Sequence, residues 1–352
     1  MSDYLATDYP QLAERLPKLD LANLPTPLEA SALVTNSGQQ PVLIKRDDLT
    51  GKLYGGNKVR KLEYLLRRAQ RRKARCIATF GAVSSNHALA TALYTKSLGL
   101  ECTCFLLHQP RTANVPRVLN THLQIGTELV PYGGNRAARI RTIREHLWRR
   151  QAWVIPVGGS SWLGTVGFVN AGLELADQVA SGDIDVPDRL YVATGTMGTA
   201  VGIALGLALA GLRTHVHAVQ VTEDFVSNPR ALRRLLTKTA MLLHSCDESI
   251  PADLAERAHC TFRSDFLGAG YAKTNAATER AVDVARDELG ITLESTYTGK
   301  AMAAMLHDLD QKQWAGQPVL FWNTYNSRPL EAGYERAEHA SRLPAEFLRY
   351  FD

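Results

Sequence analysis

The sequence predicts an α/β protein with mainly parallel sheets. Short β-rich runs alternate with helical patterns along the 352 residues, an order typical of repeated strand–helix units. With 45% hydrophobic and 21% charged residues, the chain has the composition of an ordinary soluble globular protein. Its length predicts about two domain-sized units.

The expected elements follow from hydrophobic periodicity and from the glycine- and proline-rich breaks between periodic runs. The expected strands are Val42–Lys45, Cys76–Thr79, Cys102–Leu107, Glu128–Pro131, Ala152–Ile155, Arg189–Ala193, His215–Val221 and Pro318–Trp322. The expected helices are Lys58–Ala74, Ser85–Leu98, Val115–Gln124, Arg136–Arg150, Leu163–Ser181, Thr199–Ala210, Ala276–Leu289 and Lys300–Asp310. No long internal repeat is visible, which disfavours a solenoid or a propeller.

Several classes of protein are disfavoured. The longest apolar stretch, Val201–Leu212, is interrupted by glycines and is shorter than the roughly 20 residues of a membrane helix. The start Met1–Tyr4 lacks a basic segment followed by an apolar one, so we expect a cytoplasmic protein with no membrane association. The 5 cysteines are odd in number and lack CxxC spacing, which disfavours disulfides and a zinc site. We expect no metal.

The net charge of +5 is concentrated in runs such as Arg67–Lys73. Such a run can attract nucleic acid, or it can be the solvent face of a helix whose apolar face includes Leu62, Leu65 and Leu66. No basic motif interleaved with aromatic residues accompanies it. We therefore expect no nucleic-acid partner.

Gly-, Ser- and Thr-rich segments follow three expected strands, where α/β proteins place ligands. They span residues 79–87, 157–164 and 192–200. In the third, Gly195 and Gly198 let the backbone approach an anion, and the following helix start offers free amides. The segment lacks the endings of a P-loop and of a Rossmann fingerprint. The same residues also suit helix capping and close packing, so both interpretations stand.

Lys58 follows the turn Gly55-Gly56-Asn57 and begins an expected helix. A cation at a helix N-terminus opposes the helix dipole, so this position is poor for a simple surface charge. In a partly buried site the same environment lowers the pKa of the ammonium and favours Schiff-base chemistry. A surface lysine after a glycine turn is the alternative.

Motifs in a fixed order extend through most of the chain. They are Pro25-Thr26-Pro27-Leu28, Arg46-Asp47-Asp48-Leu49, Gly55-Gly56-Asn57-Lys58-Val59-Arg60-Lys61-Leu62-Glu63, Ser85-Asn86-His87, Gly158-Gly159-Ser160-Ser161, Thr194–Thr199 and Tyr297-Thr298-Gly299-Lys300-Ala301-Met302. In this combination the chain resembles pyridoxal-phosphate (PLP) enzymes of the tryptophan-synthase-β-like fold, fold type II. More narrowly, it resembles the D-cysteine desulfhydrase and 1-aminocyclopropane-1-carboxylate deaminase family. The resemblance implies two open, twisted, mainly parallel sheets flanked by helices.

The resemblance also implies roles for particular residues. Lys58 is expected to anchor the cofactor covalently and, once freed, to carry the proton at the substrate Cα. Ser85 is expected beside the substrate carboxylate, and Asn86 at the phenolic oxygen of the cofactor. Tyr271 and Tyr297 match two substrate-side tyrosines, although Tyr271 equally suits the core. The remaining cofactor contacts are expected from Thr194, Gly195, Thr196, Met197, Gly198, Thr199, Thr298 and Thr324.

Thr298 separates the two activities of the family, because the resemblance places Glu there in the deaminases and Thr in the desulfhydrases. A neutral threonine near the pyridine ring supports less ring protonation than a carboxylate, which suits β-elimination better than opening of a cyclopropane. The leading hypothesis is therefore a lyase that converts D-cysteine to pyruvate, ammonia and sulfide. The alternatives are 1-aminocyclopropane-1-carboxylate deaminase, cysteate sulfo-lyase and a noncatalytic protein that binds PLP or an amino acid.

The chain departs from the family pattern in three places. Residues 323–328 replace the usual His-Thr/Leu-Gly-Gly turn, Ser84 replaces the usual glutamine before Ser-Asn, and Trp162 follows the Gly-Gly-Ser-Ser turn. Asn326 and Arg328 suit an anionic substrate side chain or, preferably, an ordinary surface salt bridge.

The resemblance implies a large PLP-binding domain formed by residues 1–49 and 157–352. A small α/β domain of residues 50–156 is inserted into it, and the cleft lies between them. A homodimer is expected from the family, and a small amino acid is the expected substrate.

Overall fold

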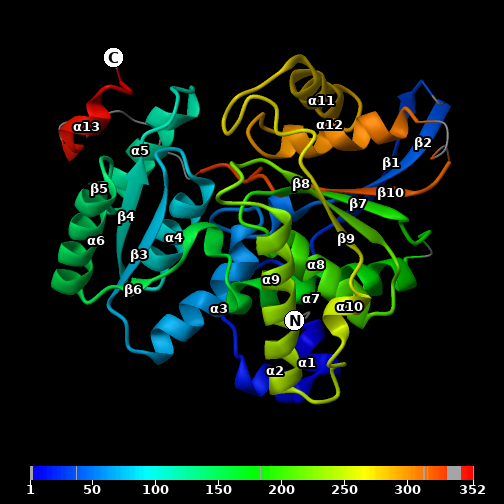
Figure 1. The fold of residues 1–352 in the computed structure, drawn as a ribbon, viewed down its shortest axis with the longest axis horizontal. Helices are drawn as coiled ribbons and strands as arrows, with labels where there is room; N and C mark the ends of the chain where they lie inside the picture. The colour runs from blue at the N-terminus through cyan, green and yellow to red at the C-terminus, as the bar shows by residue number, and fades with distance from the viewer. Residues whose placement is uncertain are drawn as a thin grey trace.

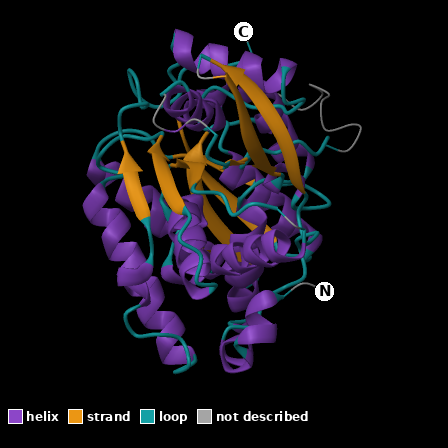
Figure 2. Cartoon of the chain, turned by 90° about the vertical axis from the view of Figure 1, so that its right-hand side faces the viewer, coloured by secondary structure: helices purple, strands orange, loops and turns teal. Residues whose placement is uncertain are grey.

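The computed structural model describes residues 3–36, 38–182, 184–311, 314, 316–330 and 342–351. Two sheets, each with helices around it, form the molecule (Figure 1). In the side view the strands lie inside and helices surround them (Figure 2). The α/β prediction is confirmed.

The larger sheet has six strands in the order β1-β2-β10-β7-β8-β9. Strands β1 and β2 form an antiparallel hairpin, and the remaining pairs are parallel. The strands are β1 Leu28–Thr35, β2 Gly38–Lys45, β7 Arg189–Thr194, β8 His215–Gln220, β9 Cys260–Arg263 and β10 Val319–Trp322.

The smaller sheet has four parallel strands in the order β5-β4-β3-β6. They are β3 Cys76–Ala82, β4 Glu101–Leu107, β5 Glu128–Pro131 and β6 Trp153–Val154. Parallel strands end at the same edge of a sheet, so the segments after β3 and β4 lie next to each other there.

Helices cover both faces of the larger sheet, with α11 and α12 on one side and α7 to α10 on the other (Figure 1). The α-helices are α1 Tyr4–Asp8, α2 Pro10–Arg15, α3 Lys58–Arg71, α4 Asn86–Ser97, α5 Asn114–Gln124, α6 Arg136–Arg150, α7 Trp162–Ser181, α8 Gly198–Leu209, α9 Pro229–Cys246, α10 Leu254–Arg257, α11 Ala276–Asp287, α12 Thr298–Leu309 and α13 Ala345–Leu348. Short 3-10 turns occupy Asp47–Leu49 and Val157–Gly159. No helix in the described part of the chain is both long and apolar enough to cross a membrane.

Strand β10 shows why the larger sheet is buried on both faces. Leu320 and Trp322 join the apolar cluster on the side of α7 and α8, whereas Val319 and Phe321 join the cluster of α11 and α12. Alternate side chains of a strand point to opposite faces, and all four are fully buried. Such a strand reads as a continuous apolar run, as expected for a parallel sheet covered on both sides.

Glycines let α8 pack directly on α7. A Cβ at Gly206 would lie 2.3 Å from the carbonyl oxygen of Val169 and 2.8 Å from the Cα of Gly172. Because any larger side chain would separate the two helices, this contact fixes the position of α8. The N-terminus of α8 lies at the site described below.

A buried network of charges holds α3 against the larger sheet. The carboxylate of Glu174 on α7 accepts hydrogen bonds from Lys45 Nζ at 2.6 Å and from Arg60 Nη1 at 2.9 Å. Arg60 Nη2 also donates to Asp47 Oδ1 at 2.7 Å. Burial alone would raise the pKa of Glu174, but Arg60 and Lys45 lower it to about 2. The network therefore ties the first turn of α3, which begins at Lys58, to β2 and α7.

The structure adds elements that sequence periodicity did not predict. Strands β1 and β9 are the edges of the larger sheet, and α9 is an 18-residue helix between β8 and β9. The predicted strands and helices are all present, with ends shifted by a few residues.

The C-terminal segment contacts the smaller sheet. The hydroxyl of Tyr350 accepts a hydrogen bond from the Gln109 amide at 3.1 Å, and the Phe347 ring lies 5.6 Å from that of His108. Helix α13 accordingly sits near α5 and β5 in Figure 1. The division into residues 1–49 with 157–352 and residues 50–156 remains our proposal, with residues 342–351 moved to the small domain because of these contacts.

Candidate active site

A cavity of about 650 Å³ lies where the two sheets face each other. Its walls come from the carboxyl ends of strands and the segments that follow them. They include Gly81, Ala82 and Ser85–His87 at the end of β3, Leu107–Pro110 at the end of β4, Thr194–Met197 and Thr199 at the end of β7, and Thr324 after β10. Ligand sites of α/β proteins form at such carboxyl ends.

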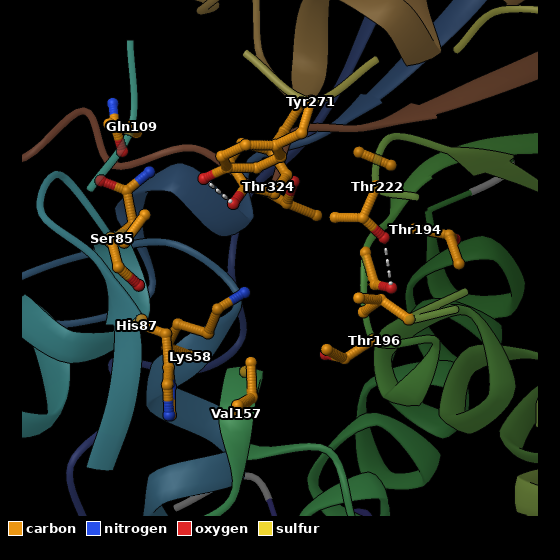
Figure 3. Close-up of a pocket in the computed structure, with 18 of the residues that line it drawn as sticks. Lys58, Ser85, His87, Gln109, Val157, Thr194, Thr196, Thr222, Tyr271 and Thr324 are labelled. Carbon is orange, nitrogen blue, oxygen red and sulfur yellow. Dashed lines mark hydrogen bonds between the residues drawn. The ribbon is translucent and has the colours of Figure 1, made fainter. Parts of the chain in front are cut away.

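Lys58 extends into this cavity between the Ser85 side and the Thr194–Thr196 side (Figure 3). Its Nζ donates to Asn57 Oδ1 at 2.7 Å, and Asn57 Nδ2 donates to Thr199 Oγ1 at 2.9 Å. Burial lowers the pKa of Lys58 to about 8, although Glu294 opposes that shift. The amine is therefore easier to deprotonate than that of an exposed lysine.

The Thr194–Thr199 loop and the start of α8 form an anion cradle. Met197 has a left-handed φ of 63° and supplies no side-chain cap to α8. The Gly198 amide approaches Ser160 Oγ at 3.3 Å, and Thr199, the second residue of the helix, lines the cavity, so the helix N-terminus presents its dipole to an anion there. The loop is braced by Thr222, whose Oγ1 donates to the Gly195 carbonyl at 3.0 Å, and by Ser160, whose Oγ lies 2.8 Å from Thr196 Oγ1.

Lys61 adds a positive charge to this cradle. Its Nζ donates to Ser160 Oγ at 2.9 Å and to the Gly158 carbonyl at 3.2 Å, and a Cβ at Gly198 would lie only 3.1 Å from it. Burial, and then the charge of Lys58, hold the pKa of Lys61 well below its usual range. Sequence analysis did not select Lys61, although its three-residue spacing from Lys58 places both amines on one face of α3.

Ser85 and Asn86 begin α4 on the opposite wall. Ser85 caps the helix by accepting a hydrogen bond from the Ala88 amide at 3.3 Å, and Asn86 Oδ1 accepts one from the Tyr54 hydroxyl at 2.8 Å. The NH₂ group of the Asn86 side chain remains available to donate to a ligand.

Tyr271 lies above Lys58 in the view of Figure 3, and its hydroxyl oxygen is 2.8 Å from that of Tyr297. Burial raises the pKa of both phenols. Both are therefore protonated at neutral pH, and one hydroxyl donates to the other. Tyr271 thus lines the cavity and is not an ordinary core residue.

Glu294 is a second residue that sequence analysis missed. One carboxylate oxygen accepts from the Tyr297 and Thr298 amides at 2.8 and 2.9 Å, and the other accepts from the Thr296 amide at 2.8 Å. The carboxylate therefore caps α12, and the neutral Thr298 is the first residue of that helix at the cavity. Burial raises the pKa of Glu294, and the hydrogen bonds from these amides oppose the shift.

The structure brings the predicted site residues to this one cavity. Its lining includes Lys58, Ser85, Asn86, Thr194, Gly195, Thr196, Met197, Thr199, Tyr271, Tyr297, Thr298 and Thr324. Gly198 lies just behind the lining, with its amide 2.8 Å from the Thr196 carbonyl.

Residues 323–328, which depart from the family pattern, stabilise the loop that precedes Lys58. Asn326 Oδ1 accepts from the Gly55 amide at 2.6 Å, and Arg328 donates to the carbonyls of Gly51 and Leu49 at 3.2 and 3.0 Å. Asn326 and Arg328 thus hold the loop before Lys58. Neither side chain lines the cavity, and within the described residues Arg328 forms no salt bridge, so the bonds that the structure gives to both side chains all go to backbone groups.

The fold and site together define a class of enzyme, in which a lysine of lowered pKa faces a helix-based anion cradle between two parallel sheets. Residues 19–324 match the family model described as pyridoxal-phosphate dependent enzyme. The D-cysteine desulfhydrases of Klebsiella pneumoniae (strain 342) and Salmonella choleraesuis (strain SC-B67) are each 33% identical to the chain, over 327 and 329 residues, covering 90% of this chain and 96% of theirs.

The fold is also similar to those of solved structures. A homologue of ACC deaminase superposes with a TM-score of 0.74 at 28% identity, covering 92% of this chain and 95% of its own. The serine racemase of Dictyostelium discoideum, at 15% identity and a TM-score of 0.61, covers 92% and 98% and shares the fold. The chain belongs to the pyridoxal-phosphate-dependent enzyme family and uses that cofactor, as the sequence predicted.

The residues present fit the cofactor. The N-terminus of α8 and the amine of Lys61 suit a phosphate, and Lys58, one turn before Lys61 on α3, lines the same cavity. Burial, and then the charge of Lys58, disfavour the charged form of Lys61, and a bound phosphate would supply the counterion that favours it.

Proposed function

We propose that the protein is a lyase that performs β-elimination on a small amino acid, with D-cysteine as the preferred substrate and pyruvate, ammonia and sulfide as products. The observation that carries this proposal is the neutral Thr298 at the start of α12, with the Glu294 carboxylate bonded to backbone amides. Position 298 thus offers a neutral hydroxyl where a ring-protonating carboxylate would favour cyclopropane opening, and the nearby Glu294 carboxylate is engaged by backbone amides. The similarity to D-cysteine desulfhydrases supports the same choice.

We assign different roles in binding the cofactor to residues on different walls of the cavity. We assign Lys58 as the covalent anchor, Thr194–Thr199 and Lys61 as the phosphate site, and Asn86 as the contact to the phenolic oxygen. When bound, pyridoxal phosphate withdraws electrons from the Cα of an attached amino acid and so acidifies its proton.

Lys58 is the group placed to move that proton. Its pKa of about 8 gives a sizeable neutral fraction at physiological pH, and Asn57 directs the amine toward the cradle side of the cavity. The Tyr271–Tyr297 pair lines the same cavity and offers a hydroxyl to the leaving group. Ser85, at the N-terminus of α4, is suited to the substrate carboxylate.

A substrate panel tests the proposal. We expect the release of pyruvate from D-cysteine to exceed that from L-cysteine, cysteate and D-serine, and little 2-oxobutyrate from 1-aminocyclopropane-1-carboxylate. Consumption of the cyclopropane alone would overturn the argument from Thr298. A preference for cysteate would favour a sulfo-lyase, and binding without turnover of any compound would favour the noncatalytic alternative.

Lys61→Gln should weaken cofactor binding by about a hundredfold, because it removes the buried amine, which donates to Ser160 Oγ at 2.9 Å, that we assign as a charge-assisted donor to the phosphate. Titration of the apoprotein with PLP, followed by absorbance, measures the change. The variant apoprotein should be no less stable than wild type, since the charge of Lys61 is unfavourable in the empty cradle. Lys96→Gln, at an exposed position on α4, is the matched control. Unchanged affinity of Lys61→Gln would exclude Lys61 from the phosphate site.

The rate of cofactor uptake should depend on pH through Lys58. Only the neutral amine condenses with an aldehyde, so uptake should rise about tenfold from pH 6 to pH 7 and level off above a pH of about 8. The reaction of PLP with N-acetyl-lysine, whose amine has an ordinary pKa, should keep rising to higher pH. A protein profile that follows this small molecule would mean that Lys58 has no lowered pKa.

The expected homodimer and the cytoplasmic location also remain proposals, supported by the family resemblance. Size-exclusion chromatography with light scattering tests the first.

A further inference from the structure

Gln109 is a cavity residue that the proposed mechanism does not use. It follows β4 in the smaller sheet and lines the cavity beside Ser85 (Figure 3). Neither family motif nor hydrophobic pattern marks it in the sequence.

The orientation of its carboxamide is fixed by Ser84. The Ser84 hydroxyl donates to Gln109 Oε1 at 2.9 Å, and the Ser84 backbone amide approaches the same atom at 3.4 Å. A backbone amide can only donate, so the atom that faces it must be the oxygen. The NH₂ group of Gln109 therefore points away from Ser84, and no acceptor for it is found among the described residues.

The main chain of Gln109 is fixed as well. The hydroxyl of Tyr350 accepts from its amide at 3.1 Å and donates to its carbonyl at 3.1 Å. Tyr350 is buried, and its hydroxyl also lies 3.1 Å from His108 Nδ1. One phenol from the C-terminal segment thus holds the loop, and Ser84 holds the side chain.

The position of this NH₂ group matters because Ser84 adjoins Ser85, the residue assigned to the substrate carboxylate. Glutamine is usual at position 84 in the family that the chain resembles. Here serine occupies that position, and a carboxamide reaches it from the neighbouring strand.

We infer that Gln109 is a substrate-binding residue, which donates a hydrogen bond to the carboxylate of the amino acid, and that Ser84 and Tyr350 position it. The inference rests on the proposed function, since it requires an amino-acid substrate. Binding of the carboxylate is then shared between the start of α4 and an amide that the C-terminal segment holds in place.

Gln109→Glu is the sharpest test. The new carboxylate keeps an oxygen for Ser84, so the loop retains its contacts, but a negative oxygen replaces the NH₂ group. We expect the KM for D-cysteine to rise about a hundredfold with a much smaller change in kcat, because a donor to a carboxylate is exchanged for a like charge. Gln311→Glu, at an exposed position, is the matched control and should behave as wild type.

Ligand binding gives a second readout. In absorbance titrations of the holoenzyme, Gln109→Glu should bind D-alanine much more weakly than wild type, yet bind ethylamine, which lacks the carboxylate, equally well. Tyr350→Phe should raise the KM in the same direction by about threefold to tenfold with kcat nearly unchanged, because it loosens the loop without removing the donor.

The two proposals fail in different ways. If wild-type protein neither turns over D-cysteine nor responds to D-alanine, the proposed function falls and this inference falls with it. If wild type does both and Gln109→Glu keeps the wild-type KM, or weakens ethylamine as much as D-alanine, only the role of Gln109 is overturned.

Discussion

Lys58→Ala should lower turnover of D-cysteine by about a thousandfold or more, because it removes the cavity amine that we propose as both the covalent anchor and the base at the substrate Cα. The cofactor should still bind, since the α8 cradle and Lys61 remain. Borohydride treatment followed by peptide mapping should find the cofactor attached to Lys58 in wild type and to no lysine in the variant. Steady-state assays and absorbance titration measure the two effects separately.

Lys58→Arg is the companion variant. It keeps a positive charge at the start of α3, but a guanidinium with a pKa above about 12 neither condenses with the cofactor nor accepts a proton at neutral pH. It should therefore be as inactive as Lys58→Ala. Substantial turnover by either variant, or a reduced adduct on Lys61, would contradict the assignment of Lys58.

The site was predictable where its chemistry is local in sequence. Two predicted parts of the site, Gly55-Gly56-Asn57-Lys58 and the Thr194–Thr199 loop, each combine a turn with the start of a helix. Both features are encoded within a few consecutive residues, so they can be recognised from the sequence. Lys61 shares this local signal through its spacing from Lys58, and could have been found.

Gln109 had no such signal. Its place in the cavity depends on the alignment of β4 with β3 and on a contact with Tyr350, which is 241 residues away. A pattern within one short segment cannot indicate a contact between residues so far apart in the sequence. The same holds for Asn326, whose Oδ1 accepts a hydrogen bond from the amide of Gly55, 271 residues away in the sequence.

The fold errors have separate physical causes. Strand β1 is an edge strand with several exposed side chains, so its sequence lacks the apolar run of a buried strand. Helix α9, in contrast, carries a clear start signal, Asn228 as the cap with Pro229 in the first turn. Its strongly basic surface obscured an otherwise regular apolar stripe that includes Leu232, Leu236 and Leu243.

The buried charge network allows the prediction with the largest effect on stability. Glu174→Gln should lower the free energy of unfolding by about 3 to 5 kcal/mol, because Lys45 and Arg60 would then share the single charge of Asp47 in the protein interior. Urea unfolding should show a lower midpoint with an unchanged slope. Asp253→Ala, which breaks the exposed Arg257 pair, should cost less than about 1 kcal/mol.

The pH dependence of the difference in unfolding free energy between wild type and Glu174→Gln shows whether the charge of Glu174 causes it. The pKa of Glu174 is lowered from 4.5 to about 2 in the folded protein, so its ionised form stabilises the fold fully above the unfolded pKa and loses that effect as pH falls through about 2. The shift corresponds to about 3 kcal/mol. The unfolding free energies of wild type and Glu174→Gln should therefore differ most above pH 5 and become similar toward pH 2. A difference that stayed constant over this range would mean that Glu174 acts through packing, and that its charge does not hold α3 and Lys58 in place.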